Sequence, residues 1–331
     1  MGLNALPRYR LLEDPTPFQL LERLGRETGH PALYIKRDDA MPLGLGGNKL
    51  RSLEYWLGAA FAEGADTLVV AGHTASNQCR LTAAAAARAG LGCVVLHNAD
   101  RPERIDGNLR LSHLYGAEIS YLGPVGEHAR REAAEAKVEA LRREGRKPYL
   151  VGDPVLGAAG YVHAGEELLA QARAAGVALR HILLPGSMGP TEAGFLHGLI
   201  RGGFDGTAHL VSVEYDVAEL EGRVARIFAG LEELAGSAGR PVGTIARFTD
   251  RYLGPGYGIP GPDAIAAIRL FAGTEALLLE QTYTAKPAAA LLSMLADGGI
   301  APDEPVCLLH TGGTASLFED DFFHAVLAPA D

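Results

Sequence analysis

The sequence predicts an α/β fold built on parallel sheets, and three observations support this prediction. Short runs of β-branched and other apolar residues alternate along the chain with Ala-rich stretches of helical periodicity. Most candidate strands are separated by candidate helices of roughly 10–15 residues, the spacing of βαβ units. Turns rich in glycine and short polar residues follow several of these strands, and ligands bind at such turns in parallel sheets.

The expected strands are short and largely apolar. They cover residues 32–36, 67–71, 92–97, 118–121, 181–184, 208–214 and 306–310. The expected helices have apolar residues three and four positions apart. They cover residues 50–63, 76–89, 108–115, 127–145, 159–175, about 192–200, 264–274 and 287–296. Ser76 is placed to cap the second of these helices, and Pro287 to begin the last.

The length of 331 residues suffices for one or two domains. We expect two α/β domains, each with a mostly parallel central sheet. The larger would be discontinuous and combine residues 1–50 with residues 160–331, and residues 51–159 would form a smaller inserted domain. A ligand in the cleft between them could then be shielded from water by closure of the small domain.

The composition argues against several classes of protein. Thirty basic and 40 acidic residues give a net charge of −10, which is opposite to the basic footprint of a nucleic-acid-binding protein. Three scattered cysteines do not form a disulfide framework or a metal site. No signal peptide and no apolar stretch of about 18 residues is present. We therefore expect a cytoplasmic protein without metal, membrane or nucleic-acid partner.

A lysine at the start of an expected helix is the first candidate for chemistry. Lys49 follows Gly46 and Gly47 and precedes helix 50–63. The positive end of a helix dipole disfavours an ammonium group and lowers its pKa. A lysine that is neutral more easily forms a Schiff base. Taken alone, the segment is better explained as a surface lysine after a turn.

The Gly-rich turn at residues 186–191 (GSMGPT) is a candidate anion site. It lies between an expected strand and an expected helix, where free backbone N–H groups bind anions, and Thr191 adds a hydroxyl. The turn matches neither a P-loop nor a dinucleotide-binding motif. It therefore suggests a phosphate on some other ligand, although Gly-rich turns without a ligand are common.

Four further segments combine turn residues with hydroxyl or amide side chains. They cover residues 72–78, 254–260, 280–286 and 310–314, and carry Ser76, Asn77, Tyr257, Tyr283 and Thr311. Each also has an ordinary structural interpretation as a helix cap or a turn.

Taken in order, these segments resemble those of the pyridoxal-phosphate-dependent family that contains 1-aminocyclopropane-1-carboxylate (ACC) deaminase and D-cysteine desulfhydrase. The segments that carry the resemblance are LYIKRDD (33–39), GGNKLRSLEY (46–55), SN (76–77), GPGYGIP (254–260), YTAK (283–286) and TGGT (311–314). The resemblance runs from about Pro15 to Phe318. It implies the tryptophan-synthase-β-like fold (fold type II), pyridoxal 5′-phosphate as cofactor, a small amino-acid substrate and a homodimer.

The resemblance also implies roles by position. Lys49 would hold the cofactor as a Schiff base, Asn77 would bond the pyridoxal 3′-oxygen, and Thr311 would face the pyridine nitrogen. Further cofactor contacts would come from Asn48, Gly186, Ser187, Met188, Gly189, Pro190, Thr191 and Thr284. Substrate contacts would come from Ser76, Asn77, Gln78, Tyr257 and Tyr283. Lys49, Ser76 and the two tyrosines are the catalytic candidates.

Two positions indicate which branch of the family the chain resembles. ACC deaminases usually carry Glu and Leu at the places of Thr284 and Thr311, whereas the desulfhydrase-like branch tends to have hydroxyl residues there. The resemblance thus implies α,β-elimination from a β-substituted amino acid to a 2-oxo acid and ammonia, and disfavours ACC ring opening. A neutral Thr at the pyridine nitrogen would make the cofactor ring a weaker electron acceptor than a charged partner would. A weaker acceptor suits elimination of a good leaving group.

The chain departs from the family pattern at several positions. Ala75 stands where a glutamine is usual, Met188 and Pro190 lie in the phosphate turn, and residues 152–154 replace a more usual Gly-Gly-Ser. The substrate therefore stays open among β-substituted amino acids such as D-cysteine, β-chloro-D-alanine and cysteate. A β-replacement synthase that traps an aminoacrylate, and a non-catalytic binding protein suggested by Ala75, are the alternatives.

Overall fold

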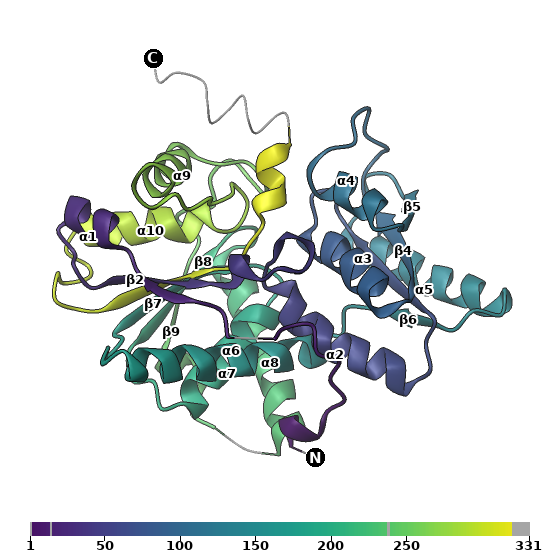
Figure 1. The fold of residues 1–331 in the computed structure, drawn as a ribbon, viewed down its shortest axis with the longest axis horizontal. Coiled ribbons are helices and arrows are strands. Elements are labelled where there is room, and N and C mark those ends of the chain that lie inside the picture. The colour runs from purple at the N-terminus through teal and green to yellow at the C-terminus, as the bar shows by residue number, and fades with distance from the viewer. Residues whose placement is uncertain (1, 14, 237–238, 320–331) are drawn as a thin grey trace.

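The computed structural model describes residues 2–13, 15–236 and 239–319. It contains two central sheets, with helices packed on both faces of each (Figure 1). The strands of the smaller sheet all lie between residues 67 and 150, and the strands of the larger sheet come from the segments on either side. The α/β architecture with two mostly parallel sheets is therefore confirmed.

The larger sheet joins the two ends of the chain. Its strands are β1 (Phe18–Leu20), β2 (Leu33–Arg37), β7 (His181–Gly186), β8 (Thr207–Ser212), β9 (Ala246–Thr249) and β10 (Val306–His310). They lie in the order β1-β2-β10-β7-β8-β9, and all neighbours are parallel except β1 and β2. Because β10 lies between β2 and β7, the turns that follow these three strands meet at one edge of the sheet.

The smaller sheet is parallel throughout. Its strands are β3 (Thr67–Gly72), β4 (Gly92–His97), β5 (Glu118–Tyr121) and β6 (Pro148–Leu150), in the order β5-β4-β3-β6. Residues 67–70 and 93–97 are buried along their whole length, as expected for central strands covered on both faces.

The described residues form ten α-helices. They are α1 (Glu22–Thr28), α2 (Lys49–Ala62), α3 (Asn77–Ala89), α4 (Gly107–Leu114), α5 (Glu127–Arg143), α6 (Pro154–Ala174), α7 (Pro190–Arg201), α8 (Val217–Ala235), α9 (Pro262–Glu275) and α10 (Ala285–Ala296). Helices α6, α7 and α8 cover one face of the larger sheet, and α1, α9 and α10 cover the other. Helices α2 and α3 pack on one face of the smaller sheet and α5 on the other. None of the described helices is long and apolar enough to cross a membrane.

Glycines bring α6 into close contact with two other helices. A Cβ atom at Gly198 of α7 would lie 2.0 Å from the carbonyl oxygen of Val162, and one at Gly160 of α6 would lie 2.1 Å from that of Arg51. Any larger residue would push the helices apart, since packed interiors have no spare volume. Helix α2, which begins at Lys49, is thereby held against a helix of the larger sheet.

Several predicted elements need correction. Helix α6 begins at Pro154, five residues before the predicted start, because the Asp153 side chain accepts the N–H of Leu156 and caps it. Helix α10 begins at Ala285, so Pro287 is its third residue rather than its first. Helices α1 and α8 and strands β1, β6 and β9 are absent from the predicted elements. The proposed domain boundaries near residues 50 and 160 stay predictions, and α6 crosses the second.

Candidate active site

A cavity of about 1040 Å³ lies between the two α/β units and is lined from both. It takes side chains from the turns that follow β3, β7 and β10. Each of these three turns is among the candidate segments that the sequence analysis singled out. The cavity thus lies at the carboxyl ends of parallel strands, the usual binding position in α/β proteins.

Backbone contacts between two Gly-rich turns place Lys49 in this cavity. Gly47 has a φ of +122°, and a Cβ atom at Gly312 would lie 2.5 Å from its Cα atom. At this close approach, the N–H of Asn48 donates to the carbonyl oxygen of Thr311 at 2.8 Å. The first residue of α2, Lys49, therefore lies beside the turn after β10.

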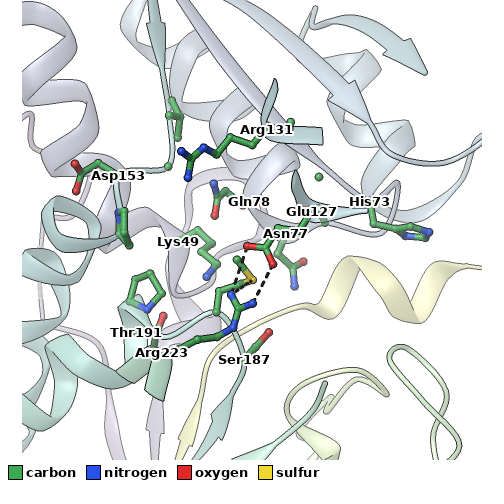
Figure 2. Close-up of a pocket in the computed structure, with 18 of the residues that line it drawn as sticks. Lys49, His73, Asn77, Gln78, Glu127, Arg131, Asp153, Ser187, Thr191 and Arg223 are labelled. Atoms are coloured by element: carbon green, nitrogen blue, oxygen red, sulfur yellow. Dashed lines mark hydrogen bonds and ion pairs between the residues drawn. The ribbon is translucent and has the colours of Figure 1, made fainter. Parts of the chain in front are cut away.

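The Lys49 ammonium lies near the middle of the cavity, between Gln78 and Thr191 (Figure 2). Among the residues that the structure describes, none forms a hydrogen bond or ion pair with its side chain. Burial lowers the pKa of Lys49, and the nearby Glu192 carboxylate opposes this effect without cancelling it. The direction of this pKa shift agrees with the prediction, and burial is its largest cause. A larger neutral fraction makes the amine a better nucleophile and base.

The turn after β7 forms a cup of backbone N–H groups at the N-terminus of α7. Pro190 is the first residue of this helix and Gly189 precedes it with a φ of +102°. The carboxylate of Glu192 accepts the N–H of Ser187 at 2.5 Å, and the N–H groups of Gly189 and of Glu192 itself also interact with it. Burial raises the pKa of Glu192 even so. The cup is therefore an anion site that already holds one carboxylate.

The turn after β3 supplies the opposite wall. Ser76 caps α3, as predicted, by accepting the N–H of Cys79 at 3.3 Å. Asn77 and Gln78 follow it in the first turn of α3, and both line the cavity. Cys79 lies behind them as a buried free thiol whose pKa burial raises to about 11, so it is not reactive at neutral pH.

Two tyrosines from different segments meet at the cavity. The hydroxyl groups of Tyr257 and Tyr283 lie 2.5 Å apart, and their rings are nearly perpendicular. Burial raises the pKa of both phenols. Both therefore stay protonated at neutral pH. One hydroxyl donates to the other, and the second has its O–H free to donate to a ligand.

A buried carboxylate holds the turn that presents Tyr283. Glu280 accepts the N–H groups of Thr282, Tyr283 and Thr284 at 2.7–2.8 Å. The Thr284 hydroxyl accepts the N–H of Glu280 at 2.8 Å and lies close to its carboxylate. Thr284 is thus engaged within the turn.

Most of the predicted site residues line this one cavity. Those that do are Asn48, Lys49, Ser76, Asn77, Gln78, Ser187, Met188, Pro190, Thr191, Tyr257, Tyr283 and Thr311. Gly186, Gly189 and Thr284 lie outside its lining, although Gly189 contributes its N–H to the cup.

The cavity also has lining residues that sequence analysis did not single out. Arg223 of α8 forms an ion pair with Glu127 of α5 at 3.0 Å and lies 4.2 Å from the ring of Tyr215. This pair connects the two units across the cavity (Figure 2). The Glu192 carboxylate was missed as well, although a Glu at the third helical position after a turn is a known capping signal.

Comparison with known proteins identifies the family. The family model described as pyridoxal-phosphate dependent enzyme matches residues 9–312. The chain belongs to this family. It is therefore an enzyme whose cofactor is pyridoxal 5′-phosphate, and the resemblance to the ACC deaminase and D-cysteine desulfhydrase family is confirmed.

Curated relatives match the chain over nearly its whole length. A D-cysteine desulfhydrase of Salmonella choleraesuis (strain SC-B67) is 35% identical over 325 residues, which cover 96% of this chain and 97% of the relative. A D-cysteine desulfhydrase of Salmonella typhi is 34% identical over the same shares.

Solved structures confirm fold type II. The crystal structure of an ACC deaminase homologue superposes with a TM-score of 0.88 at 30% identity and covers 98% of this chain and 97% of that one. The processed form of threonine deaminase isoform 2 from Solanum lycopersicum superposes with a TM-score of 0.67 at 17% identity, over 95% of this chain and 83% of that one. The latter likeness concerns the fold alone.

The residues of the cavity fit the cofactor. The cup at α7 holds the Glu192 carboxylate, so its donors suit an anion such as a phosphate. Thr191 and Asn48, joined by a hydrogen bond of 2.9 Å, lie next to the cup. Lys49 offers an amine with a lowered pKa in the same cavity. A phosphate bound there would compete with the Glu192 carboxyl group for these N–H donors.

Proposed function

We propose that the protein catalyses α,β-elimination from a β-substituted amino acid, with D-cysteine as the first candidate. The products would be pyruvate, ammonia and hydrogen sulfide. The observation that carries the proposal is the convergence of the Lys49 amine and the Tyr257–Tyr283 pair on one cavity that also contains a phosphate-type cup. Full-length similarity to enzymes named D-cysteine desulfhydrase supports the choice of substrate.

The bound cofactor supplies an electron sink that stabilises negative charge at Cα of the substrate. Lys49, with its lowered pKa, would take the Cα proton. One of Tyr257 and Tyr283 donates to the other, and the second, which stays protonated, would donate a hydrogen bond to the leaving sulfur. Thr311, buried at the turn after β10, would meet the ring nitrogen with a neutral hydroxyl. Ser76 and Asn77 at the start of α3 would bind the substrate carboxylate.

The experiment is a visible absorbance scan of the purified holoenzyme, repeated after addition of D-cysteine, L-cysteine, cysteate and ACC in separate samples. We expect D-cysteine to change the cofactor band and to release pyruvate and sulfide in equal amounts. Lys49→Ala serves as the matched control and should release neither. Turnover of ACC alone would replace the proposed reaction with ring opening.

A second measurement separates elimination from β-replacement. The reaction with D-cysteine is repeated with an added thiol, and the products are quantified. Undiminished pyruvate supports elimination, whereas a thioether product formed at the expense of pyruvate shows a β-replacement synthase. A cytoplasmic homodimer completes the proposal, consistent with three buried free cysteines and with the frequency of two-fold symmetric enzymes.

A further inference from the structure

Lys286 is a buried cation that the proposed reaction does not use. It is the second residue of α10, has no exposed side-chain surface and is not part of the cavity lining. Its ammonium donates to the carbonyl oxygens of Val213, Leu253 and Gly256 at 3.1, 2.7 and 3.1 Å. An ammonium group has three donors, so these three acceptors use all of them.

Two of these acceptors belong to the loop that carries Tyr257. Leu253 and Gly256 flank the tight turn of this loop, and the Gly256 carbonyl belongs to the peptide bond that leads into Tyr257. Lys286 itself follows Tyr283 by three residues. The segment 280–286 therefore contacts the tyrosine loop twice, once through the two phenols and once through the Lys286 ammonium.

Packing alone does not require a charge at this position. Burying an ammonium costs several kcal/mol, and here no carboxylate among the described residues lies within ion-pair distance to offset that cost. The charge also lies in the first turn of α10, where the helix dipole opposes it. An apolar side chain would fill the same volume without these costs, but it could not bind three carbonyl groups.

We propose that Lys286 is a positioning residue, whose ammonium ties the 253–257 loop to the 280–286 turn and so fixes the Tyr257–Tyr283 pair relative to the substrate. The effect on turnover rests on the proposed function, in which the two phenols contact the substrate. The effect on the loop itself does not depend on it.

The charge of Lys286 makes the loop sensitive to pH. Burial lowers the pKa of Lys286 to about 8, and the more distant carboxylates of Glu280 and Glu214 partly oppose this. The other titratable groups around it, Tyr257 and Tyr283, have raised pKa values and stay neutral in this range. Opening of the loop that brings the amine into water would return its pKa toward about 10.4. Such opening should therefore become less favourable as the pH rises above about 8.

The same titration affects global stability in the same direction. The folded pKa of about 8 lies below the unfolded value of about 10.4. The penalty for burying the charge is therefore complete below pH 8 and disappears as the pH rises from about 8 to about 10.4. The closed loop and the folded chain should thus both gain stability from this residue over this pH range.

The test combines hydrogen exchange with kinetics on the holoenzyme. Lys286→Met is compared with the wild type and with Lys147→Met, which removes an exposed lysine outside the cavity lining. At pH 7 we expect Lys286→Met to exchange backbone hydrogens of residues 253–260 at least tenfold faster. Wild-type exchange there should rise between pH 7 and pH 9 by less than the intrinsic pH dependence. Lys147→Met should behave as the wild type.

Kinetics test whether Lys286 acts through Tyr257. We expect Lys286→Met to raise KM for D-cysteine about tenfold while the cofactor band is unchanged, and to have no further effect in a Tyr257→Phe background. Exchange of residues 253–260 that is unchanged in Lys286→Met at pH 7 and that follows the intrinsic pH dependence in the wild type would overturn the proposal. If Lys286→Met does not fold, the wild-type exchange profile decides alone. Faster exchange of residues 253–260 in Lys286→Met, without any turnover of D-cysteine by the wild type, would refute the proposed function but not the positioning role of Lys286.

Discussion

Replacement of Arg51 by Met should strongly destabilise the protein, because Arg51 is the centre of a buried ion cluster. Its guanidinium binds both carboxylate oxygens of Asp38 at 2.9 Å and both of Glu167 at 3.1 Å. Lys36 pairs with Glu167 as well, and Tyr161 donates to Asp38. The two cations and two carboxylates balance, so loss of Arg51 leaves one uncompensated negative charge.

The expected cost is about 3–5 kcal/mol, the range for removing one partner of a buried ion pair. Asp38 has no exposed surface, so water cannot replace the lost donors. This is a large part of a total stability of about 5–15 kcal/mol. In Arg51→Met/Asp38→Asn the uncompensated charge is also removed. We therefore expect the double variant to be more stable than the sum of the two single effects by about 0.5–3 kcal/mol.

Urea unfolding, followed by the fluorescence of Trp56, measures this cost. Trp56 is the only tryptophan and is buried in α2, five residues after Arg51. The midpoint of unfolding is compared for the wild type, Arg51→Met, Arg51→Lys and the double variant. Arg51→Lys keeps the charge but loses the forked contact to Asp38, so it should lie between the wild type and Arg51→Met.

The pH dependence of the stability difference between the wild type and Arg51→Met tests this account of the ion cluster. Burial raises the pKa of Asp38 and of Glu167, but Arg51 and Lys36 outweigh it and the net pKa of both is lowered. A lowered carboxyl pKa stabilises the fold above the unfolded pKa of about 4, and this contribution is lost as the pH falls through the folded pKa. The difference between wild type and Arg51→Met should therefore shrink below about pH 4. A difference under about 1 kcal/mol at pH 7 would show that the cluster is not balanced as described.

Three further predictions concern the cavity. Lys49→Ala should abolish the visible absorbance of the bound cofactor, and an unchanged spectrum would remove Lys49 from its assigned role. Thr311→Leu should shift that band and slow elimination, whereas an unaltered rate would place Thr311 outside the site. Glu192→Gln removes the negative charge from the amide cup, so it should lower the Kd for pyridoxal phosphate in a spectroscopic titration, most strongly at the alkaline end of the range tested. An equal Kd for Glu192→Gln and the wild type from pH 6 to pH 9 would show that this carboxylate does not compete with the phosphate.

The lining residues Lys49, Asn77 and Thr311 could be predicted from sequence because their positions depend on local patterns. A strand, a Gly-rich or polar turn and a helix are readable in sequence, and parallel strands bring their carboxyl ends to one edge. Lys49, Asn77 and Thr311 follow this rule and line one cavity. The resemblance of the GGNKLRSLEY and GPGYGIP segments added the identity of the cofactor, which the periodicity alone did not contain.

Other features depend on contacts between distant segments, which local periodicity does not encode. Arg223 and Glu127 are 96 residues apart and meet only because α8 and α5 face each other across the cavity. The β2 pattern predicts a strand but not that Lys36 is buried and balanced by Glu167 of α6. Helix α8 is a different case. Its buried residues Leu220, Val224 and Ile227 have helical spacing, so a fuller reading of the sequence would have found it.

Lys49 and the Tyr257–Tyr283 pair are held in the cavity by different kinds of contact. Lys49 is placed by backbone contacts, since the N–H groups of Gly47 and Asn48 bond the carbonyl oxygens of Asp38 and Thr311. The Tyr257–Tyr283 pair is placed by the buried side chains of Glu280 and Lys286, which bind backbone groups of the turns that carry it. Side-chain substitutions can therefore loosen the Tyr257–Tyr283 pair while Lys49 keeps its position. The substrate contacts should accordingly be easier to alter by mutation than the position of the lysine.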